Sequence, residues 1–298
     1  MQTTYLSLNG VRMAESEYAH GRCYLRLYGD LSDPNSKKLL KLVRMKTVRN
    51  SGLDLPSKEH AHDVNDEKLE NNISRARNKI FELAFCNHWD YFVTATLDGT
   101  KYNREDLETF HKDLTKWLSN QSHKLGSKIH FLLIPELHSD GRTWHMHGFI
   151  CGLPSSELKQ FRIGDRMGKG IAAKVKQGDL VYDWPSYRSK FGFCDLEPIK
   201  NHEAVSKYVT KYISKSLANS VSDLHAHLYY HSRGLSEAKD IKRGTLGSLI
   251  PSVPISSLSC EHCIVEWYSA DDLDGILSAF SDSEYITYEK FLEESCIE

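Results

Sequence analysis

Two apolar runs that flank an Asp140-Gly141 pair occupy the middle of the sequence, between residues 129 and 150. An Asp-Gly pair between such runs is the strongest short-range signal for a β-hairpin with a two-residue type I′ turn. Counting outward along the ladder from that turn places Glu136 directly across from His145. The pairing register therefore predicts a carboxylate beside an imidazole in the middle of a sheet.

Side chains alternate along a strand, so His145 and His147 share one face. Opposed residues have Cβ atoms about 5 Å apart, which lets Glu136, His145 and His147 converge on one ion. Two imidazoles and a carboxylate suit Mn²⁺ or Zn²⁺, and the carboxylate also suits Mg²⁺. His138 lies on the same face and is the reserve ligand. The alternative is a half-buried hairpin whose polar side chains simply face solvent.

Length and composition are those of an ordinary globular protein. The 298 residues with 40% hydrophobic content fit one large domain, or one domain with substantial extensions. No apolar run reaches the length of a bilayer, and the first residues do not resemble a signal peptide. We expect no membrane association and a cytoplasmic protein, in a bacterial host if the resemblance described below holds.

The seven cysteines are scattered and odd in number, which argues against a disulfide framework and fits a reducing compartment. Cys260 and Cys263 have the spacing of half a zinc knuckle, but no second pair of suitable spacing follows. Free thiols are therefore the expected state.

The formal net charge of -2 hides an uneven distribution. Residues 260–298 contain eleven acids and one lysine, a net charge of -10, so the first 259 residues carry +8. A near-neutral total thus does not argue against a polyanionic partner.

Three elements precede the hairpin. Residues 66–85 have helical apolar spacing with Asn65 as a possible N-cap, residues 90–97 read as a strand, and residues 103–119 read as a helix capped by Asn103. The order predicts an α+β fold, an antiparallel sheet with helices packed on one face in the ferredoxin-like manner, with the metal site on a central hairpin.

Residues 158–200 interleave basic and aromatic side chains, among them Arg162, Lys169, Trp184 and Tyr187. Such a mixture can neutralise phosphates and stack on bases, which predicts a nucleic-acid groove. The alternative is a solvated loop with ordinary surface charge.

The next element, residues 203–215, has helical spacing with Tyr208 and Tyr212 one turn apart and a parallel lysine stripe that includes Lys211 and Lys215. The tyrosines could be amphipathic core residues. A tyrosine can also act as a covalent nucleophile if a neighbouring cation or a metal lowers the pKa of its phenol from about 10.

These residues carry a resemblance to a known family. His145-Met146-His147 resembles the His-hydrophobic-His motif of HUH endonucleases, and residues 208–215 resemble the tyrosine motif of two-tyrosine rolling-circle replication initiators (Rep) of small single-stranded DNA phages and plasmids. Residues 92–96 and 136–141 are similar to the segments that precede these motifs, and residues 229–235 to one that follows. The resemblance extends from about residue 71 to residue 234.

The resemblance implies site-specific, metal-dependent nicking and joining of single-stranded DNA. A divalent ion, Mg²⁺ or Mn²⁺, held by Glu136, His145 and His147 would polarise the scissile phosphate. Tyr208 or Tyr212 would attack to form a 5′-phosphotyrosine link, with Lys211 and Lys215 lowering the phenol pKa or holding the phosphate.

The implied partners are single-stranded DNA at a replication origin, a separate host helicase and a polymerase, because the sequence contains no P-loop. A relaxase or transposase would use the same site. A catalytically inactive nucleic-acid-binding module would keep the groove without cleavage.

The same patterns divide the chain into an N-terminal extension of unknown role (1–65), the HUH endonuclease domain (66–246), a Pro- and Ser-containing linker (247–259) and an acidic C-terminal appendage (260–298). The appendage could mask the basic groove, in which case deleting residues 252–298 would tighten DNA binding. It could equally be a small helical extension around residues 267–280.

Overall fold

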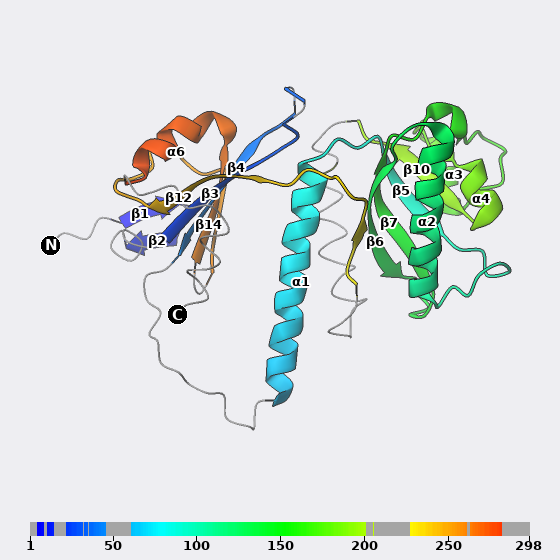
Figure 1. Cartoon of the computed structure of the whole chain (residues 1–298), viewed down its shortest axis with the longest axis horizontal. Coiled ribbons are helices and arrows are strands. Elements are labelled where there is room, and N and C mark those ends of the chain that lie inside the picture. The colour runs from blue at the N-terminus through cyan, green and yellow to red at the C-terminus, as the bar shows by residue number, and fades with distance from the viewer. Residues whose placement is uncertain are drawn as a thin grey trace. The chain divides into compact units, whose positions relative to one another are not determined.

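The computed structural model describes residues 5–8, 11–14, 22–45 except 32 and 35, 61–200, 205, 227–260 and 263–281, with side chains from residue 22 to 45 and from residue 72 onward. The chain forms two compact units (Figure 1). One unit comprises Met1–Pro56 and Glu237–Glu298, and the other comprises Ser57–Ser236.

The unit Ser57–Ser236 is built on a seven-stranded antiparallel sheet in the order β11-β6-β7-β5-β10-β9-β8. Its strands are β5 (Tyr91–Thr96), β6 (His130–Leu137), β7 (Trp144–Cys151), β8 (Lys159–Gln160), β9 (Tyr182–Asp183), β10 (Cys194–Pro198) and β11 (Tyr230–His231). Strand β7 lies between β6 and β5 in the interior of this sheet. The predicted α+β class and the position of the hairpin within the sheet are therefore confirmed.

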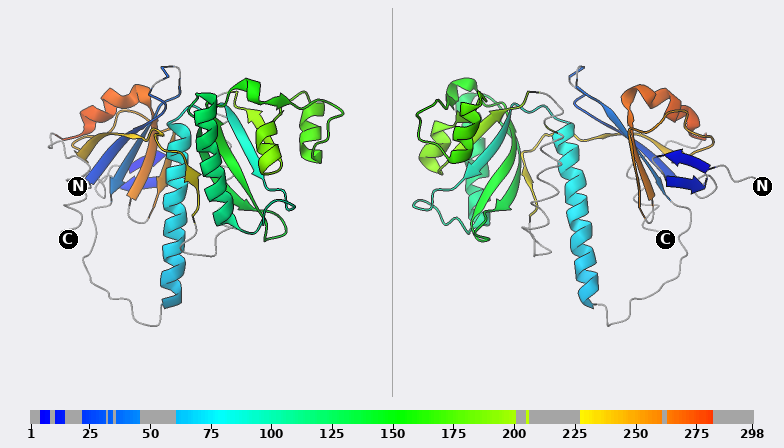
Figure 2. Two further views of the ribbon diagram at one scale, coloured as in Figure 1. Left: turned by 45° about the vertical axis from the view of Figure 1, so that its right-hand side comes forward. Right: turned by 180° about the vertical axis from the view of Figure 1, so that it is seen from behind.

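Helices cover both faces of this sheet, whereas we expected them on one face (Figure 2). Helix α2 (Leu107–Leu125) and the short α4 (Pro185–Lys190) pack on one face, and α1 (Ala61–Phe85) packs on the other. Helix α3 (Lys169–Lys176) lies between β8 and β9 in the chain and has its own small cluster with Phe161 and Val181. A short 3-10 turn, η3 (Ser155–Glu157), follows β7.

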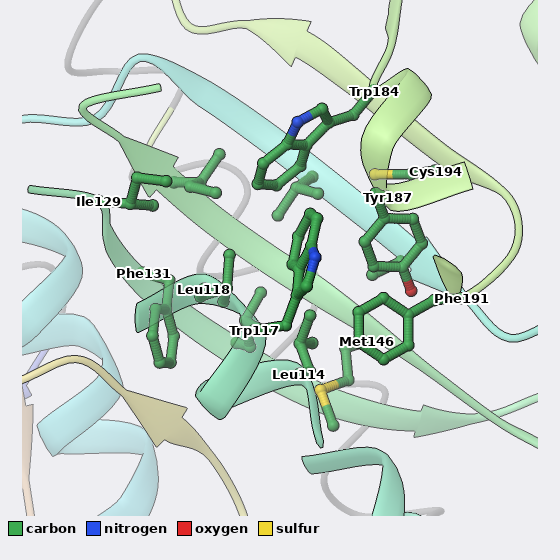
Figure 3. Close-up of a cluster of buried hydrophobic side chains, with 14 of the residues drawn as sticks. Leu114, Trp117, Leu118, Ile129, Phe131, Met146, Trp184, Tyr187, Phe191 and Cys194 are labelled. Carbon is green, nitrogen blue, oxygen red and sulfur yellow. The ribbon is translucent and has the colours of Figure 1, made fainter. Parts of the chain in front are cut away.

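The face under α2 is an aromatic core (Figure 3). Trp117 packs against Trp184 with ring centroids 4.7 Å apart and edge-on against Phe191 at 5.4 Å. Leu114, Leu118 and the strand residues Phe131, Met146 and Cys194 complete the cluster. The α1 face instead buries Ile73, Ile80, Leu83 and Ala84 against Phe92, Leu132, Ile134 and Phe149.

The two helices predicted before the hairpin are present, but their first residues differ. Helix α1 begins at Ala61, so Asn65 lies inside the helix and is not its cap. Helix α2 begins at Leu107, and Asp106, not Asn103, caps it by accepting a hydrogen bond from the Thr109 amide. Asp106 directly precedes the first apolar residue of the buried stripe, and an N-cap is favoured at that position.

The hairpin keeps the predicted register with a different loop. Glu136 pairs with His145 and Leu137 pairs with Trp144, as predicted. The Gly141 amide, however, donates to the carbonyl of His138 at 2.9 Å, so the two-residue type I′ turn at Asp140-Gly141 is wrong. The loop is longer than predicted but is centred on the same two residues, Asp140 and Gly141. Lengthening a loop equally on both sides leaves the pairing of the strand residues unchanged.

The other unit contains a five-stranded antiparallel sheet in the order β12-β3-β4-β14-β13, besides the β1–β2 hairpin (Tyr5–Leu8 and Val11–Ala14). Its strands are β3 (Arg22–Tyr28), β4 (Leu39–Met45), β12 (Lys239–Thr245), β13 (Ser256–Ser259) and β14 (Cys263–Ser269), followed by η4 (Ala270–Asp272) and α6 (Leu273–Ala279). Leu25, Leu40, Leu42, Tyr268 and Ile276 form its core.

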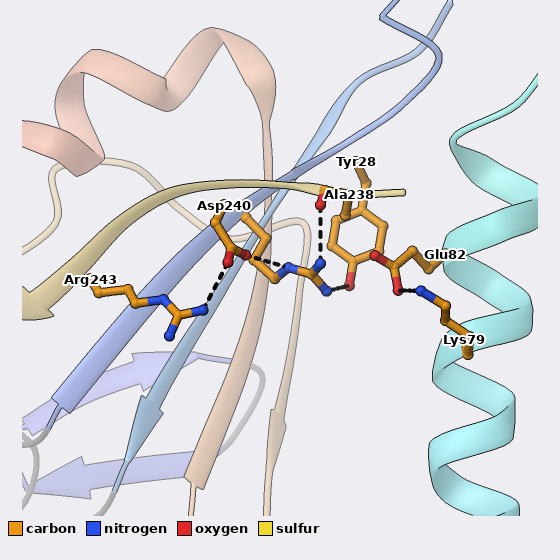
Figure 4. A network of polar contacts seen from close by, with 7 residues as sticks. Tyr28, Lys79, Glu82, Ala238, Asp240 and Arg243 are labelled. Atoms are coloured by element: carbon orange, nitrogen blue, oxygen red, sulfur yellow. Dashed lines mark hydrogen bonds and ion pairs between the residues drawn. The ribbon is translucent and has the colours of Figure 1, made fainter. Parts of the chain in front are cut away.

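A polar network ties β12 to β3 (Figure 4). Arg26 donates to the Asp240 carboxylate at 2.8 Å and to the carbonyl oxygen of Ala238 at 3.0 Å. Arg243 donates to the other Asp240 oxygen at 2.8 Å. These contacts of Arg26 join residues more than two hundred positions apart in the sequence.

The structure thus divides the chain differently from the predicted division. Strand β14 pairs with β4, and β12 pairs with β3, so segments predicted as an N-terminal extension and a C-terminal appendage share one sheet. Strand β13 lies within the predicted linker. Strands that pair across such a long separation cannot be recognised as partners from the local sequence pattern. Deleting residues 252–298 would remove β14 from this sheet, so that deletion cannot test masking of the basic stretch.

Described helices include none with the length and hydropathy needed to cross a bilayer. Cys260, which lies within the described part of the chain, is an exposed free thiol.

Gly148 is the position at which the hairpin tolerates no side chain. A Cβ atom there would collide with the backbone carbonyl of Leu132 on β6. We predict that Gly148→Ala lowers the free energy of unfolding by about 1–3 kcal/mol through overpacking. Urea denaturation followed by circular dichroism measures this change.

The matched control is Gly170→Ala in α3, where a Cβ meets no atom within 4 Å. Alanine has the higher helix propensity, so this variant should be neutral or more stable by up to about 1 kcal/mol. Equal stability of the two variants would contradict the proposed close approach of β6 and β7.

Candidate metal centre

The polar residues of the centre lie in two adjacent rows across β5, β7 and β6. In the first row Thr96, His145 and Glu136 are directly opposed, and in the second row Thr94 is opposed to His147. Alternation of side chains puts these residues on the face of the sheet that also carries Phe92, Leu132 and Phe149. The centre therefore lies on the α1 face, away from the aromatic core under α2.

Glu136, His145 and His147 converge as the sequence predicted. Their ligand atoms all lie within 4.8 Å of one another. Glu136 Oε2 is 3.2 Å from Nε2 of His145 and 3.0 Å from Nε2 of His147. The side chains of His145 and His147 are 10% and 13% exposed, against 28% for Glu136. The two imidazoles are thus largely buried, and the carboxylate is the most exposed of the three side chains.

The electrostatics of the group favour a cation. Hydrogen bonds from His145 and His147, followed by the charges of these imidazoles, hold the pKa of the Glu136 carboxyl well below its usual range. An ionised carboxylate and two imidazole nitrogens in such proximity form a nitrogen–oxygen donor set that divalent ions accept. The donor set therefore fits a divalent metal ion.

His138, the reserve ligand, lies beside the group but is not part of it. Its ring centroid is 4.1 Å from that of His145. Its Nε2 is buried and has no hydrogen-bond partner among the described residues. Burial, followed by the charge of His145, lowers the pKa of His138, so the ring is held in the neutral form that a metal ligand needs.

The tyrosine segment is represented in the structure by one residue. Tyr208, Tyr212, Lys211 and Lys215 lie outside the described residues. Val205 is helical, 3% exposed and packed in the cluster of the α1 face. Val205 therefore packs on the same face of the sheet as Glu136, His145 and His147.

Comparison with known proteins identifies the family of this region. Residues 90–217 match the family of replication-associated proteins of the ORF2 type. This segment, less than half of the chain, is similar to replication-associated proteins. The predicted resemblance to rolling-circle Rep proteins is confirmed. No curated protein and no solved structure matches the chain.

The matched segment contains both the metal group and the tyrosine motif. It begins at Asp90, directly before β5, and ends beyond Lys215. The strand that carries Thr94, the hairpin and the tyrosine segment thus belong to one family unit, and the five-stranded sheet of the other unit lies outside it.

The basic and aromatic stretch of the domain does not form the predicted stacking surface. Phe161, Trp184, Tyr187 and Phe191 are buried, between 0% and 6% exposed, so their rings are unable to stack on bases. Arg188 pairs with Asp183 at 2.8 Å and covers the ring of Phe193. Sequence spacing did not reveal that these aromatic residues fill two clusters. The exposed basic side chains of the stretch remain available for phosphates.

Two polar residues near the centre were given no role from sequence. Thr94 Oγ1 lies 3.2 Å from Nδ1 of His147. Asp195 on β10 is directly opposed to Thr94 and only 8% exposed. Burial, followed by the charge of Glu197, raises the pKa of Asp195 to about 6, although a hydrogen bond from Thr94 opposes the shift. The available signal was an acid that alternates with the apolar residues Cys194 and Leu196 in a short strand.

Metal binding to the group of Glu136, His145 and His147 is tested by thermal unfolding with Mn²⁺. An ion that binds only the folded state stabilises it by about 2.7 kcal/mol at a hundred times its Kd, so the melting temperature should rise. Glu136→Gln and His147→Ala should lose this rise, and His123→Ala, an exposed change at the end of α2, should retain it. A full rise in Glu136→Gln would instead assign the third ligand to His138.

The raised pKa of Asp195 predicts a pH dependence of stability. A folded-state pKa of about 6 lies above the unfolded value near 4, so the folded state binds this proton more tightly. The associated stability is present below about pH 4 and is lost as the pH rises through 6. Asparagine at this position does not ionise, so the free energy of unfolding of Asp195→Asn relative to wild type should increase by up to about 3 kcal/mol between about pH 4 and pH 7.

Urea denaturation of metal-free protein in EDTA across this pH range measures the difference between Asp195→Asn and wild type. Parallel curves for the two proteins would mean that Asp195 is not desolvated as the structure indicates.

Proposed function

We propose that this protein initiates rolling-circle DNA replication by nicking and rejoining single-stranded DNA through a 5′-phosphotyrosine intermediate. The observation that carries the proposal is the convergence of Glu136, His145 and His147 on the sheet face where Val205 begins the tyrosine segment. The family match of residues 90–217 supports the same assignment.

Glu136, His145 and His147 would hold a divalent ion, Mg²⁺ or Mn²⁺. When bound, such an ion polarises a phosphate oxygen and stabilises the charge that develops in the transition state. The carboxylate is the most exposed of the three ligands, so the DNA phosphate would approach from its side. The buried imidazoles would fix the position of the group relative to the sheet.

Tyr208 or Tyr212 would supply the nucleophile. The phenol oxygen would attack the phosphorus and form the tyrosine–phosphate bond, and the bond to the 3′ oxygen would break. The phenol proton would pass to solvent, and the 3′ oxygen would take up a proton to become the free 3′-OH that primes synthesis. Because the phosphodiester energy is stored in the covalent link, rejoining would need no nucleotide.

Lys211 and Lys215 each follow a tyrosine by three residues. A cation near a phenol favours the phenolate, which lowers its pKa, and an ammonium group can also hold a phosphate oxygen. Val205 anchors the segment on the α1 face, and helical spacing predicts that Tyr208 and Tyr212 share its stripe. A one-turn separation would let either tyrosine reach the same phosphate by a small shift.

The substrate would be single-stranded DNA at a replication origin, with a separate host helicase for unwinding and a polymerase for extension. The sequence contains no P-loop that could drive unwinding. A replication role is favoured over a relaxase or transposase by the description of the matched family, and the intact Glu136, His145 and His147 favour an enzyme over an inactive DNA-binding module.

Incubating the protein with labelled single-stranded DNA from its own replicon and Mn²⁺ should give a covalent adduct that resists denaturant. Tyr208→Phe and Tyr212→Phe should each keep some single cleavage, and the double variant should keep none. Glu136→Ala, His145→Ala and His147→Ala should each abolish nicking with the fold intact. Denaturing gels and adduct mapping by mass spectrometry measure both effects.

The matched control is Tyr182→Phe on β9, outside the metal centre. This variant should form the adduct at the wild-type rate. Adduct on one tyrosine alone, through initiation and termination alike, would reduce the mechanism to a single nucleophile. Adduct formation by the double variant would overturn the assignment of both residues.

A further inference from the structure

A continuous row of polar side chains crosses three strands behind one of the metal ligands. Asp195 on β10 is directly opposed to Thr94 on β5, and Thr94 is directly opposed to His147 on β7. The Thr94 hydroxyl is hydrogen-bonded to the Asp195 carboxylate, and its oxygen lies 3.2 Å from Nδ1 of His147. On the other side of the imidazole, Nε2 of His147 lies 3.0 Å from Glu136.

The carboxylate that ends this row is out of reach of solvent. Asp195 is 8% exposed, and its neighbours on β10, Cys194 and Leu196, are 1% and 0% exposed. Lys174, whose charge favours ionisation of Asp195, is itself engaged with Glu197 at 2.6 Å. A buried carboxyl group costs stability unless it is compensated, and here the charge of Lys174, followed by the hydrogen bond from the Thr94 hydroxyl, favours its ionised form.

The number of protons available along the row determines which group donates and which accepts each hydrogen bond. An ionised carboxylate only accepts hydrogen bonds, so the single proton of the Thr94 hydroxyl points to Asp195. The oxygen of Thr94 is then free to accept, and Nδ1 of His147 must carry the proton that it accepts. Nε2 of His147 faces the Glu136 carboxylate, so a divalent ion that takes the place of the proton between them would meet a lone pair on Nε2, with the remaining ring proton held at Nδ1.

We propose that Asp195 and Thr94 are positioning residues that hold His147 in the tautomer protonated at Nδ1, with Nε2 presented to a divalent ion. The inference rests on the proposed function, since it deepens the account of the same metal centre. Outer hydrogen bonds of this kind orient a ligating histidine and raise its basicity. Asp195 lies on β10, which is separated from His147 on β7 by β5, so the Thr94 hydroxyl on β5 connects the carboxylate to the imidazole ring.

The second histidine of the centre has no comparable support. Nδ1 of His145 is buried without a hydrogen-bond partner among the described residues. Thr96 is opposed to His145 as Thr94 is opposed to His147, yet it does not supply that partner. Residue type, strand and face are the same at the two positions, which makes Thr96 the matched control for Thr94.

The test compares Thr94→Val, Thr94→Ser and Thr96→Val in the full chain. The affinity for Mn²⁺ alone is measured from the electron paramagnetic resonance of the free ion. Thr94→Val removes the hydroxyl at nearly constant volume and should weaken Mn²⁺ binding roughly ten- to hundredfold. Thr94→Ser restores the hydroxyl and should bind close to wild type, as should Thr96→Val. Wild-type affinity in Thr94→Val would overturn the proposal.

A second measurement reads the tautomer directly and needs no metal. Nitrogen-15 spectra of histidine-labelled, metal-free protein should show His147 protonated at Nδ1 in the wild type and in Thr94→Ser, and a changed distribution in Thr94→Val. A wild-type His147 whose Nδ1 carries no proton would contradict the relay. A purely structural role of Thr94 would change stability without changing this signal.

Asp195→Asn keeps the proposal testable if Thr94→Val fails to fold. The amide removes the buried charge, so above about pH 6 this variant should be more stable than wild type when metal-free, yet it should bind Mn²⁺ more weakly. Loss of affinity with a gain of stability is the opposite of a folding defect. Unchanged Mn²⁺ affinity in Asp195→Asn would remove Asp195 from the relay.

The outcomes separate this inference from the proposed function. Wild-type protein that binds Mn²⁺ with the expected Thr94 dependence, but forms no adduct with DNA, would leave the relay standing and overturn the nicking proposal. If Thr94→Val instead keeps the wild-type affinity for Mn²⁺ and still forms the adduct at low Mn²⁺, the relay would be overturned and the nicking proposal would stand.

Discussion

The antiparallel pairing of β6 with β7 is the constraint on which the metal centre depends. Because strand side chains alternate, a slip of one residue would turn His145 and His147 into the α2 core and bring Met146 to the α1 face. The register is held by apolar residues on both faces and by the close approach of Gly148 to the Leu132 carbonyl. Packing far from any ligand thus decides where the ligand atoms meet.

Burying polar groups on the α1 face costs free energy, which the opposite face offsets. Trp117, Trp184, Tyr187 and Phe191 interlock under α2 with little exposed surface. Large aromatic side chains bury more apolar area than any others, so this core is well suited to stabilising a sheet that carries a polar site on its other face. The aromatic residues of the segment 158–200 therefore act on the site indirectly, through the sheet, and not by stacking on DNA bases.

Local sequence patterns predicted what is local in the structure. The register around Asp140-Gly141 placed Glu136 opposite His145 even though the loop was misassigned, because both loops share one centre of symmetry. Long-range pairing could not be predicted in the same way. Asp195 reaches Thr94 only because β10 pairs with β5 from about a hundred residues away, and the sheet of the other unit joins β4 to β14 across more than two hundred.

The asymmetry between the two histidines bears on how one ion could serve two nucleophiles. His147 is held at Nδ1 by the row that ends at Asp195, whereas His145 lacks such a contact among the described residues. A centre with one fixed ligand and one less constrained ligand can keep its place in the sheet as the bound phosphate changes position. The proposed successive attack by Tyr208 and Tyr212 would require a shift of that kind. The buried carboxylate is therefore best explained by ligand positioning, a role that offsets its cost in stability.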